Sequence, residues 1–273
     1  MHITKIIIPA AGIGSRFLPI TKSIPKEMLP LSNKPAIEYI VQEAHDAGIH
    51  TINIVLSPEK NVIKDYFSEN THLNELLEKS GKTNLVASIN HLIAHNSFSY
   101  FYQYEPAGLA DALSKAQSAI HKGEFFAVAL PDDIIFDKVA ELARMIKLAQ
   151  EKKAMVIAVQ KVPQEQTSAY GIASIKQAID DAHFLVESFI EKPTPDQAPS
   201  NYAIVGRYIF CQELFDFIAQ TPKTKGEILL PETINLMIQN GYPVYAHVIQ
   251  GTRFDTGTPS GWIHFIKSQT AEL

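Results

Sequence analysis

The chain has 273 residues, 46% of them hydrophobic and 19% charged, with 24 Lys and Arg against 29 Asp and Glu. This balance is typical of a globular protein with a sizeable core, and it excludes a disordered chain or a small disulfide-stapled scaffold. The formal net charge of -5 gives no electrostatic reason to expect nucleic acid or an anionic membrane surface as a partner.

Short runs rich in Ile and Val alternate with amphipathic segments of helical period through the first 160 residues. This alternation predicts an α/β fold, a doubly wound, Rossmann-like, mixed but mostly parallel sheet with helices on both faces. Ligands of such sheets bind beyond the carboxyl ends of the strands, so we expect the chemistry in the loops after Ile8, Tyr102 and Leu130. In chain order the expected strands are Ile6 to Ile8, Ile52 to Leu56, Phe125 to Leu130 and Met155 to Val159, and the expected helices are Ala36 to Ala47, Ala107 to His121 and Val139 to Gln150.

The pattern changes after about residue 160, where strand candidates at 171–175, 184–191 and 203–210 precede two helices between Gln212 and Asn240. We expect these elements to continue the first sheet, so that residues 1–273 form a single domain. The polar, helical excursion at 59–82 has two interpretations, a solvated helical hairpin or an interface.

The loop after the first strand reads Ala-Ala-Gly-Ile-Gly-Ser-Arg at residues 10–16. Small residues let the backbone approach a ligand closely, so amide N–H groups and the Arg16 guanidinium suit a phosphate cradle. Two better-known motifs are absent. The third glycine of a dinucleotide fingerprint would fall at Phe17, and no Lys-Ser or Lys-Thr follows the glycines as a P-loop requires. Taken alone, such a loop is weak evidence and is more often a structural turn.

Two carboxylates follow strand candidates in distant parts of the chain. Asp132 stands in Leu-Pro-Asp-Asp after the strand that begins at Phe125, and Asp255 again lies between a strand and a helix. Mg²⁺ prefers one or two carboxylates together with substrate phosphates and waters. Each Asp alone could be a helix cap or turn former, but together they predict a metal clamp.

Two neighbouring pairs of opposite charge complete the candidates, Lys26 with Glu27 and Glu191 with Lys192. A Lys at the end of a strand could neutralise a phosphate while the adjacent Glu accepts hydrogen bonds from hydroxyls. The alternative is a solvated ion pair of little energetic value. The ten histidines show no metal-binding spacing, and no Gly-x-Ser-x-Gly elbow supports a serine nucleophile.

Cys211 is the only cysteine, so the chain can form no internal disulfide, and a reducing, cytoplasmic location fits best. Pro9 and Arg16 interrupt the first apolar run before it reaches the length of a signal peptide. No apolar stretch approaches the roughly 20 residues that span a bilayer. We therefore expect an unprocessed cytoplasmic chain with no membrane partner.

Taken together, these segments resemble the bacterial UTP-glucose-1-phosphate uridylyltransferases, and more broadly the sugar-1-phosphate nucleotidylyltransferases. The resemblance runs along nearly the whole chain, and the first stretch is highly specific. Its main pieces are Pro9-Ala10-Ala11-Gly12, Arg16-Phe17-Leu18-Pro19, Pro25-Lys26-Glu27-Met28-Leu29-Pro30, Gln103-Tyr104-Glu105-Pro106, Leu130-Pro131-Asp132-Asp133, Tyr170-Gly171 and Glu191-Lys192-Pro193.

The resemblance implies the nucleotide-diphospho-sugar transferase fold, with a nucleotide-binding half at about 1–160 and a sugar-binding half at about 161–273. It implies transfer of the uridylyl group of UTP to glucose 1-phosphate, giving UDP-glucose and pyrophosphate by Mg²⁺-assisted in-line attack on the α-phosphorus. A homodimer or homotetramer is also implied. Because a phosphate monoester has its second pKa near about 6, the attacking oxygen is already ionised and needs no general base.

The resemblance also assigns roles to individual residues. Those implied in catalysis are Arg16, Lys26, Asp132 and Lys192, and those implied in binding the nucleotide are Ala10, Ala11, Gly12, Gly14, Glu27, Gln103 and Gly108. Those implied for the sugar are Gly171, Glu191 and Lys192, and the metal ligands are Asp132 and Asp255.

Two positions depart from the family's usual pattern. Asp111 and Leu229 stand near the implied base and sugar pockets, and they bear on which base and which sugar the protein accepts. Two alternatives therefore stay beside the main hypothesis. One is a nucleotidylyltransferase for another base, such as that of dTTP, or another sugar 1-phosphate. The other is a catalytically weak homologue that binds nucleotide-sugars and regulates a partner.

Overall fold

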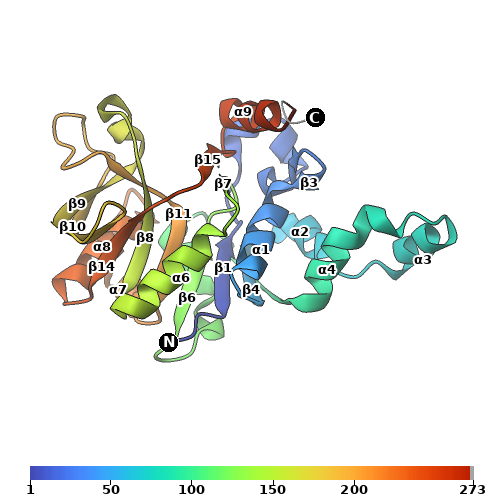
Figure 1. Cartoon of the computed structure of the whole chain (residues 1–273), viewed down its shortest axis with the longest axis horizontal. Coiled ribbons are helices and arrows are strands. Elements are labelled where there is room, and N and C mark those ends of the chain that lie inside the picture. The colour runs from blue at the N-terminus through green and yellow to red at the C-terminus, as the bar shows by residue number, and fades with distance from the viewer. Residues whose placement is uncertain (271–273) are drawn as a thin grey trace.

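The computed structural model describes residues 1–270, which form one nine-stranded sheet and three two-stranded pairs (Figure 1). The strands of the large sheet are β1 (Lys5–Pro9), β4 (Thr51–Leu56), β5 (Ser97–Tyr102), β6 (Phe125–Ala129), β8 (Met155–Lys161), β9 (Gly171–Ala178), β10 (His183–Glu191), β11 (Tyr202–Cys211) and β14 (Val244–Val248). The small pairs are β2 (Pro30–Leu31) with β3 (Lys34–Pro35), β7 (Asp133–Phe136) with β15 (Thr252–Asp255), and β12 (Lys223–Thr224) with β13 (Glu227–Ile228).

Helices cover both faces of the large sheet. On one face α1 and α6 pack against the strands, and on the other face α5, α7 and α8 do so. The helices are α1 (Ala36–Asp46), α2 (Asn61–Tyr66), α3 (Thr71–Lys79), α4 (Ala87–His95), α5 (Leu109–Lys115), α6 (Glu141–Lys152), α7 (Leu214–Gln220), α8 (Leu230–Gln239) and α9 (Pro259–Thr270). The α/β, doubly wound class expected from the sequence is therefore confirmed.

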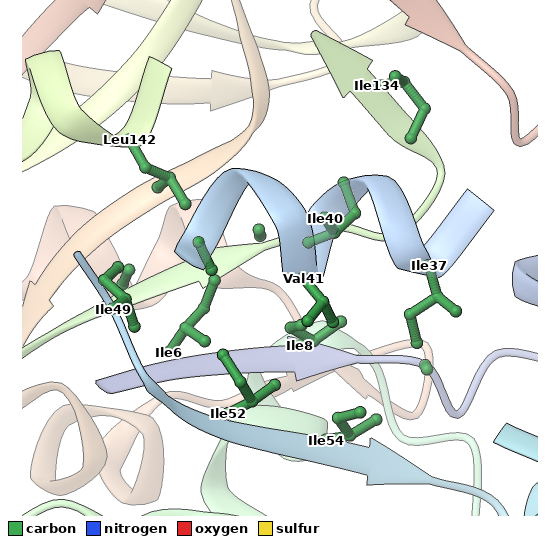
Figure 2. Packing of buried hydrophobic residues seen from close by; sticks show 14 of the residues in the cluster. Ile6, Ile8, Ile37, Ile40, Val41, Ile49, Ile52, Ile54, Ile134 and Leu142 are labelled. Carbon is green, nitrogen blue, oxygen red and sulfur yellow. The ribbon is translucent and has the colours of Figure 1, made fainter. Parts of the chain in front are cut away.

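The central strands read as continuous apolar runs because both of their faces are buried. Ile6 and Ile8 of β1 pack beneath α1, whereas Ile7 points to the opposite face and joins the cluster around α5. Figure 2 shows Ile37 and Ile40 of α1 above these strand residues. Their spacing follows the helical period. Each such side chain contributes about 1.5–3 kcal/mol when it leaves water.

The sheet is less parallel than expected. In the order β5-β4-β1-β6-β11-β8-β14-β10-β9, four neighbouring pairs are parallel and four are antiparallel. Strand β11 lies between β6 and β8 and runs antiparallel to both. Local apolar patterns do not reveal such an insertion, because it depends on pairing between segments far apart in the sequence.

Helix α5 is shorter than the segment predicted at 107–121. It begins after Gly108, whose φ of 95° lies in the region that favours glycine, and it ends at Lys115. A short 3₁₀ turn, Gln117–Ala119, follows it. The expected strand and helix positions otherwise agree with the structure to within a few residues.

The excursion between β4 and β5 is helical, as expected. It contains α2, α3 and α4, and Figure 1 shows α3 and α4 projecting away from the large sheet. Helix α3 contains no buried residue, and Leu73 and Leu76 are 40% and 50% exposed. The apolar side chains of α3 thus lie at the surface.

Candidate functional site

The loop after β1 is held from below by a buried lysine. The Nζ of Lys60, in the 3₁₀ turn Pro58–Lys60 after β4, donates hydrogen bonds to the carbonyl oxygens of Ala10 and Gly12 at 2.8 and 2.5 Å. It also contacts both carboxylate oxygens of Glu27, at 3.0 and 2.8 Å. Glu27 is only 1% exposed, so its carboxylate is directed at Lys60 within the protein. This ion pair fixes the course of the loop.

Two glycines shape the turns that flank the cleft. Gly14 has a φ of 73°, and its carbonyl oxygen accepts a hydrogen bond from Thr21 at 2.8 Å. A Cβ at Gly108 would lie 2.9 Å from the carbonyl oxygen of Ile228, which is closer than carbon and oxygen can pack. Both positions therefore require glycine for backbone conformation, and Gly108 requires it for space as well.

Asp132 follows β6 and forms a close ion pair with Lys26. Burial by itself raises the pKa of Asp132, but the ammonium and hydrogen bond of Lys26 outweigh it and hold that pKa below the ordinary value. Burial likewise acts to lower the pKa of Lys26, yet Asp132 and Glu27 hold it above its ordinary value. Both groups are therefore charged at neutral pH. The exposed Arg16 adds a second positive charge nearby.

The β7–β15 pair brings a second carboxylate to Asp132. Asp255 pairs with Asp133 across these strands, and the backbone N–H of Thr256 donates to the carbonyl oxygen of Asp132 at 2.8 Å. A Cβ at Gly257 would meet Asp132 Oδ2 at 2.6 Å and Asp255 Oδ1 at 3.2 Å. The two carboxylates thus border one small space. Burial, and then the negative charges of Asp133 and Asp132, raise the pKa of Asp255.

Asp133 has structural partners of its own. One carboxylate oxygen accepts from Nε of Arg253 at 2.5 Å, and the other accepts from the backbone N–H of Gly206 at 2.7 Å. Asp133 therefore ties β7 to β11 and β15. Asp133 also borders the cavity that contains Glu191, but both of its carboxylate oxygens already accept these hydrogen bonds.

The predicted sugar residues lie at the meeting of β9, β10 and β11. A Cβ at Gly171 would lie 3.2 Å from a carboxylate oxygen of Glu191, so glycine leaves room for that side chain. Lys192 follows Glu191 with a positive φ of 45°, and its Nζ lies 3.5 Å from the Glu191 carboxylate. The Lys192 side chain is 61% exposed and does not line the cavity that contains Glu191.

Two cavities at the carboxyl edge of the sheet share a wall. The first, of about 310 Å³, is bordered by the loop at Ala11 and Gly12 and by Gln103. The second, of about 330 Å³, contains Glu191. Asp132 borders both, so the two cavities adjoin at this carboxylate, and together we call them the cleft. The other residues that border both cavities are Leu109, Leu130 and Glu227.

Most of the predicted residues border these two cavities. The first is bordered by Ala11, Gly12, Lys26, Glu27, Gln103 and Gly108, the second by Arg16, Gly171, Glu191 and Asp255, and both by Asp132, whereas Ala10, Gly14 and Lys192 border neither. Sequence reasoning missed Lys60 and Arg253 as partners of the site, because a buried lysine or arginine has no local signature.

Within residues 1–270 no group of three or more His, Cys, Asp or Glu side chains is arranged to hold a metal ion. In the same range no helix is long and apolar enough to cross a membrane.

A doubly wound sheet with a glycine-bearing loop and paired carboxylates at its carboxyl edge is typical of enzymes that act on nucleotides. Residues 5–272 match the family model for nucleotidyl transferases, and the chain belongs to this family. The UTP–glucose-1-phosphate uridylyltransferase of Pseudomonas aeruginosa is 40% identical over 264 residues, which cover 96% of this chain and 94% of that protein. The protein of the same name from Staphylococcus haemolyticus is 40% identical over 263 residues, covering 96% and 90%.

Solved structures agree with these relatives. An apo UDP-glucose pyrophosphorylase superposes with a TM-score of 0.94 at 33% identity and covers 99% of both chains. A UTP-bound enzyme of this kind from Acinetobacter baumannii superposes with a TM-score of 0.92 at 36% identity, covering 100% of this chain and 95% of that one.

Proposed function

We propose that the protein is a UTP-glucose-1-phosphate uridylyltransferase, which makes UDP-glucose and pyrophosphate from UTP and glucose 1-phosphate. The single observation that carries the proposal is the pair of adjoining cavities, one bordered by Ala11 and Gly12 and the other by Glu191, which share Asp132. In this reaction the phosphate of the sugar must approach the α-phosphorus of the nucleotide. Asp132 lies where the two cavities adjoin. The similarity to the named uridylyltransferases supports the choice of substrates.

The loop side of the cleft takes UTP in this proposal. The backbone at Ala10, Ala11, Gly12 and Gly14 approaches the nucleotide, and Gln103 and Gly108 contact the base. Arg16 and Lys26 hold the triphosphate. Since Lys60 binds loop carbonyls and Glu27 from the protein side, the loop is already ordered for this contact. Glu27 then serves the nucleotide site by anchoring Lys60.

Asp132 and Asp255 hold the divalent cation, for which we propose Mg²⁺. Their carboxylates are the hard oxygen donors that Mg²⁺ prefers, and Gly257 keeps the space between them free of a side chain. The elevated pKa of Asp255, caused by burial and by Asp133, reflects crowded negative charge that a cation would relieve. When bound, the cation neutralises phosphate charge and polarises the phosphorus under attack.

The other side of the cleft takes glucose 1-phosphate. Gly171 leaves space beside Glu191, whose carboxylate accepts hydrogen bonds from sugar hydroxyls. Lys192 binds the phosphate, because it directly follows Glu191 and its exposed ammonium lies 3.5 Å from the Glu191 carboxylate. The positive charges of Arg16, Lys26 and Lys192 bring two polyanions together, so the protein acts by positioning and charge neutralisation.

The proposal is tested by measuring pyrophosphate release from purified protein with Mg²⁺, glucose 1-phosphate and either UTP or dTTP. We expect rapid release with UTP and its loss in Asp132→Asn, which keeps the shape but removes the charge. Faster release with dTTP or with another sugar phosphate would indicate a nucleotidylyltransferase with a different substrate specificity. No release with any pair, despite binding of UDP-glucose, would favour the regulatory homologue.

The cytoplasmic location and the homodimeric or homotetrameric state stay predictions. The exposed Leu73, Leu76 and Leu85 of the excursion supply apolar surface that an assembly could cover. Light scattering coupled to size-exclusion chromatography measures the mass in solution directly.

A further inference from the structure

Gln103 directly follows β5 and lies where we place the base of the nucleotide. Its side-chain amide is held in one orientation. Its backbone N–H donates to the carbonyl oxygen of Leu56 at 2.8 Å, which continues the sheet. The residue is 7% exposed and borders the cavity that we assign to the nucleotide. A buried carboxamide at this position can present either its oxygen or its NH₂ group to a ligand.

The two partners of the Gln103 amide decide which end faces inward. Nε2 lies 2.8 Å from Oδ2 of Asp111 and 3.2 Å from the carbonyl oxygen of Gly108. Both partners can only accept hydrogen bonds, because an ionised carboxylate and a carbonyl have no proton to donate. The NH₂ group must therefore point toward them. Oε1 is left with no hydrogen-bond partner among residues 1–270, although it belongs to a residue that borders the cavity.

The surroundings of Asp111 hold its carboxylate in the position that keeps this orientation of Gln103. It lies in the first turn of α5, and its other carboxylate oxygen accepts from Lys115 Nζ at 3.0 Å, one helical turn further on. The Asp111 side chain is 14% exposed and does not border the cavity that we assign to the nucleotide. Asp111 therefore acts on a ligand only through Gln103.

We infer that Asp111 is a positioning residue for base selection, because it forces Gln103 to present a hydrogen-bond acceptor to the Watson–Crick edge of the base. Uracil and thymine carry an N–H at position 3 and can donate to this oxygen. Cytosine carries a lone pair at position 3, which the oxygen repels. This inference rests on the proposed function, since it places the base of the nucleotide beside Gln103. It predicts selection against cytosine and no selection between uracil and thymine.

The departure from the family's usual pattern at position 111 therefore has a physical consequence, which is the orientation of the Gln103 amide. A neutral amide at this position could turn its own NH₂ group toward Gln103 and allow the reverse orientation. A carboxylate cannot, and its charge strengthens the hydrogen bond that it accepts. The same charge also repels a nucleoside triphosphate, but it repels UTP, dTTP and CTP equally. The ratio of activities between two nucleotides therefore isolates the effect on the base.

The test compares UTP, dTTP and CTP as substrates of the wild type and of Asp111→Asn, by the kcat/KM of pyrophosphate release. We expect the preference for UTP over CTP to fall about tenfold or more in the variant, as for the loss of one charge-assisted hydrogen bond. The preference between UTP and dTTP should not change. Asp111→Ser, which also replaces an obligatory acceptor by a group that can donate, gives a second variant if the first does not fold.

Lys115→Met is the matched control, because it removes the outer partner of Asp111 and leaves the carboxylate facing Gln103. It should keep the wild-type preference for UTP over CTP. An unchanged preference in both Asp111 variants would overturn the inference. So would an equal fall in Lys115→Met, since a general disturbance of α5 would then explain the result.

A second readout separates this inference from the proposed function. The dissociation constants of UTP and CTP are measured with Mg²⁺ and no sugar phosphate, so that no reaction is needed. A wild type that binds UTP more tightly than CTP but releases no pyrophosphate would refute the transferase activity and leave the role of Asp111 standing. Equal affinity of the wild type for both nucleotides would overturn that role.

Discussion

Replacing Lys60 by Met tests whether the buried ion pair beneath the loop holds the nucleotide side of the cleft. Methionine fills a similar volume but removes four polar contacts, two to Glu27 and one each to the carbonyls of Ala10 and Gly12. Glu27, at 1% exposure, would then be a buried carboxylate that has lost its ion-pair partner. Breaking one side of a buried pair costs about 3–5 kcal/mol of unfolding free energy.

A second substitution separates the two contributions to this loss of unfolding free energy, the buried Glu27 charge and the lost hydrogen bonds to the loop. In the double variant Lys60→Met with Glu27→Met no charge is left buried, so most of that loss should return. The Ala10 carbonyl still lacks its donor, and an unsatisfied buried acceptor leaves about 1–3 kcal/mol of destabilisation. The difference in unfolding free energy between the single and double variants is therefore the cost of burying the Glu27 charge without Lys60.

Urea unfolding followed by circular dichroism measures these free energies, and the KM for UTP reports on the loop. We expect the KM to rise in both variants, because both lose the hydrogen bonds to the loop carbonyls. Lys115→Met is the control for an exposed pair and should cost less than about 1 kcal/mol. A loss below about 1 kcal/mol in Lys60→Met would refute the reasoning, as would a double variant less stable than the single one.

Three further predictions concern other parts of the molecule. Gly108→Ala should destabilise the protein and raise the KM for UTP, because a Cβ would collide with the Ile228 carbonyl; unaltered thermal unfolding and kinetics would contradict this. Lys192→Ala should raise the KM for glucose 1-phosphate and leave the KM for UTP unchanged, which initial-rate measurements decide. Burial alone raises the pKa of Glu141, but hydrogen bonds with His247 at 2.6 Å and with the backbone N–H groups of Gln250 and Gly251 hold it below 4.5. Its contribution to stability is complete above pH 4.5 and disappears as the pH falls through the lower folded value, so Glu141→Gln should flatten this acid-side dependence in urea titrations.

Local patterns in the sequence were sufficient for the class of fold and for several parts of the cleft. Runs such as Ile6 to Ile8 identify buried strands, since a strand covered on both faces cannot tolerate polar side chains. The loop at residues 10–16 and Asp132 could be expected at the carboxyl edge because they directly follow such strands. Neighbouring residues along the chain carry all the information that these predictions need.

Only the tertiary structure decided which distant side chains meet. Glu27 and Lys60 are both charged residues that the sequence would place at the surface, yet their pairing allows both to be buried. The insertion of β11 between β6 and β8, and the β7–β15 pair that carries Asp255 to Asp132, depend on contacts across more than 40 residues. The orientation of Gln103 was likewise hidden, because an amide shows which end faces a ligand only when its partners are in place.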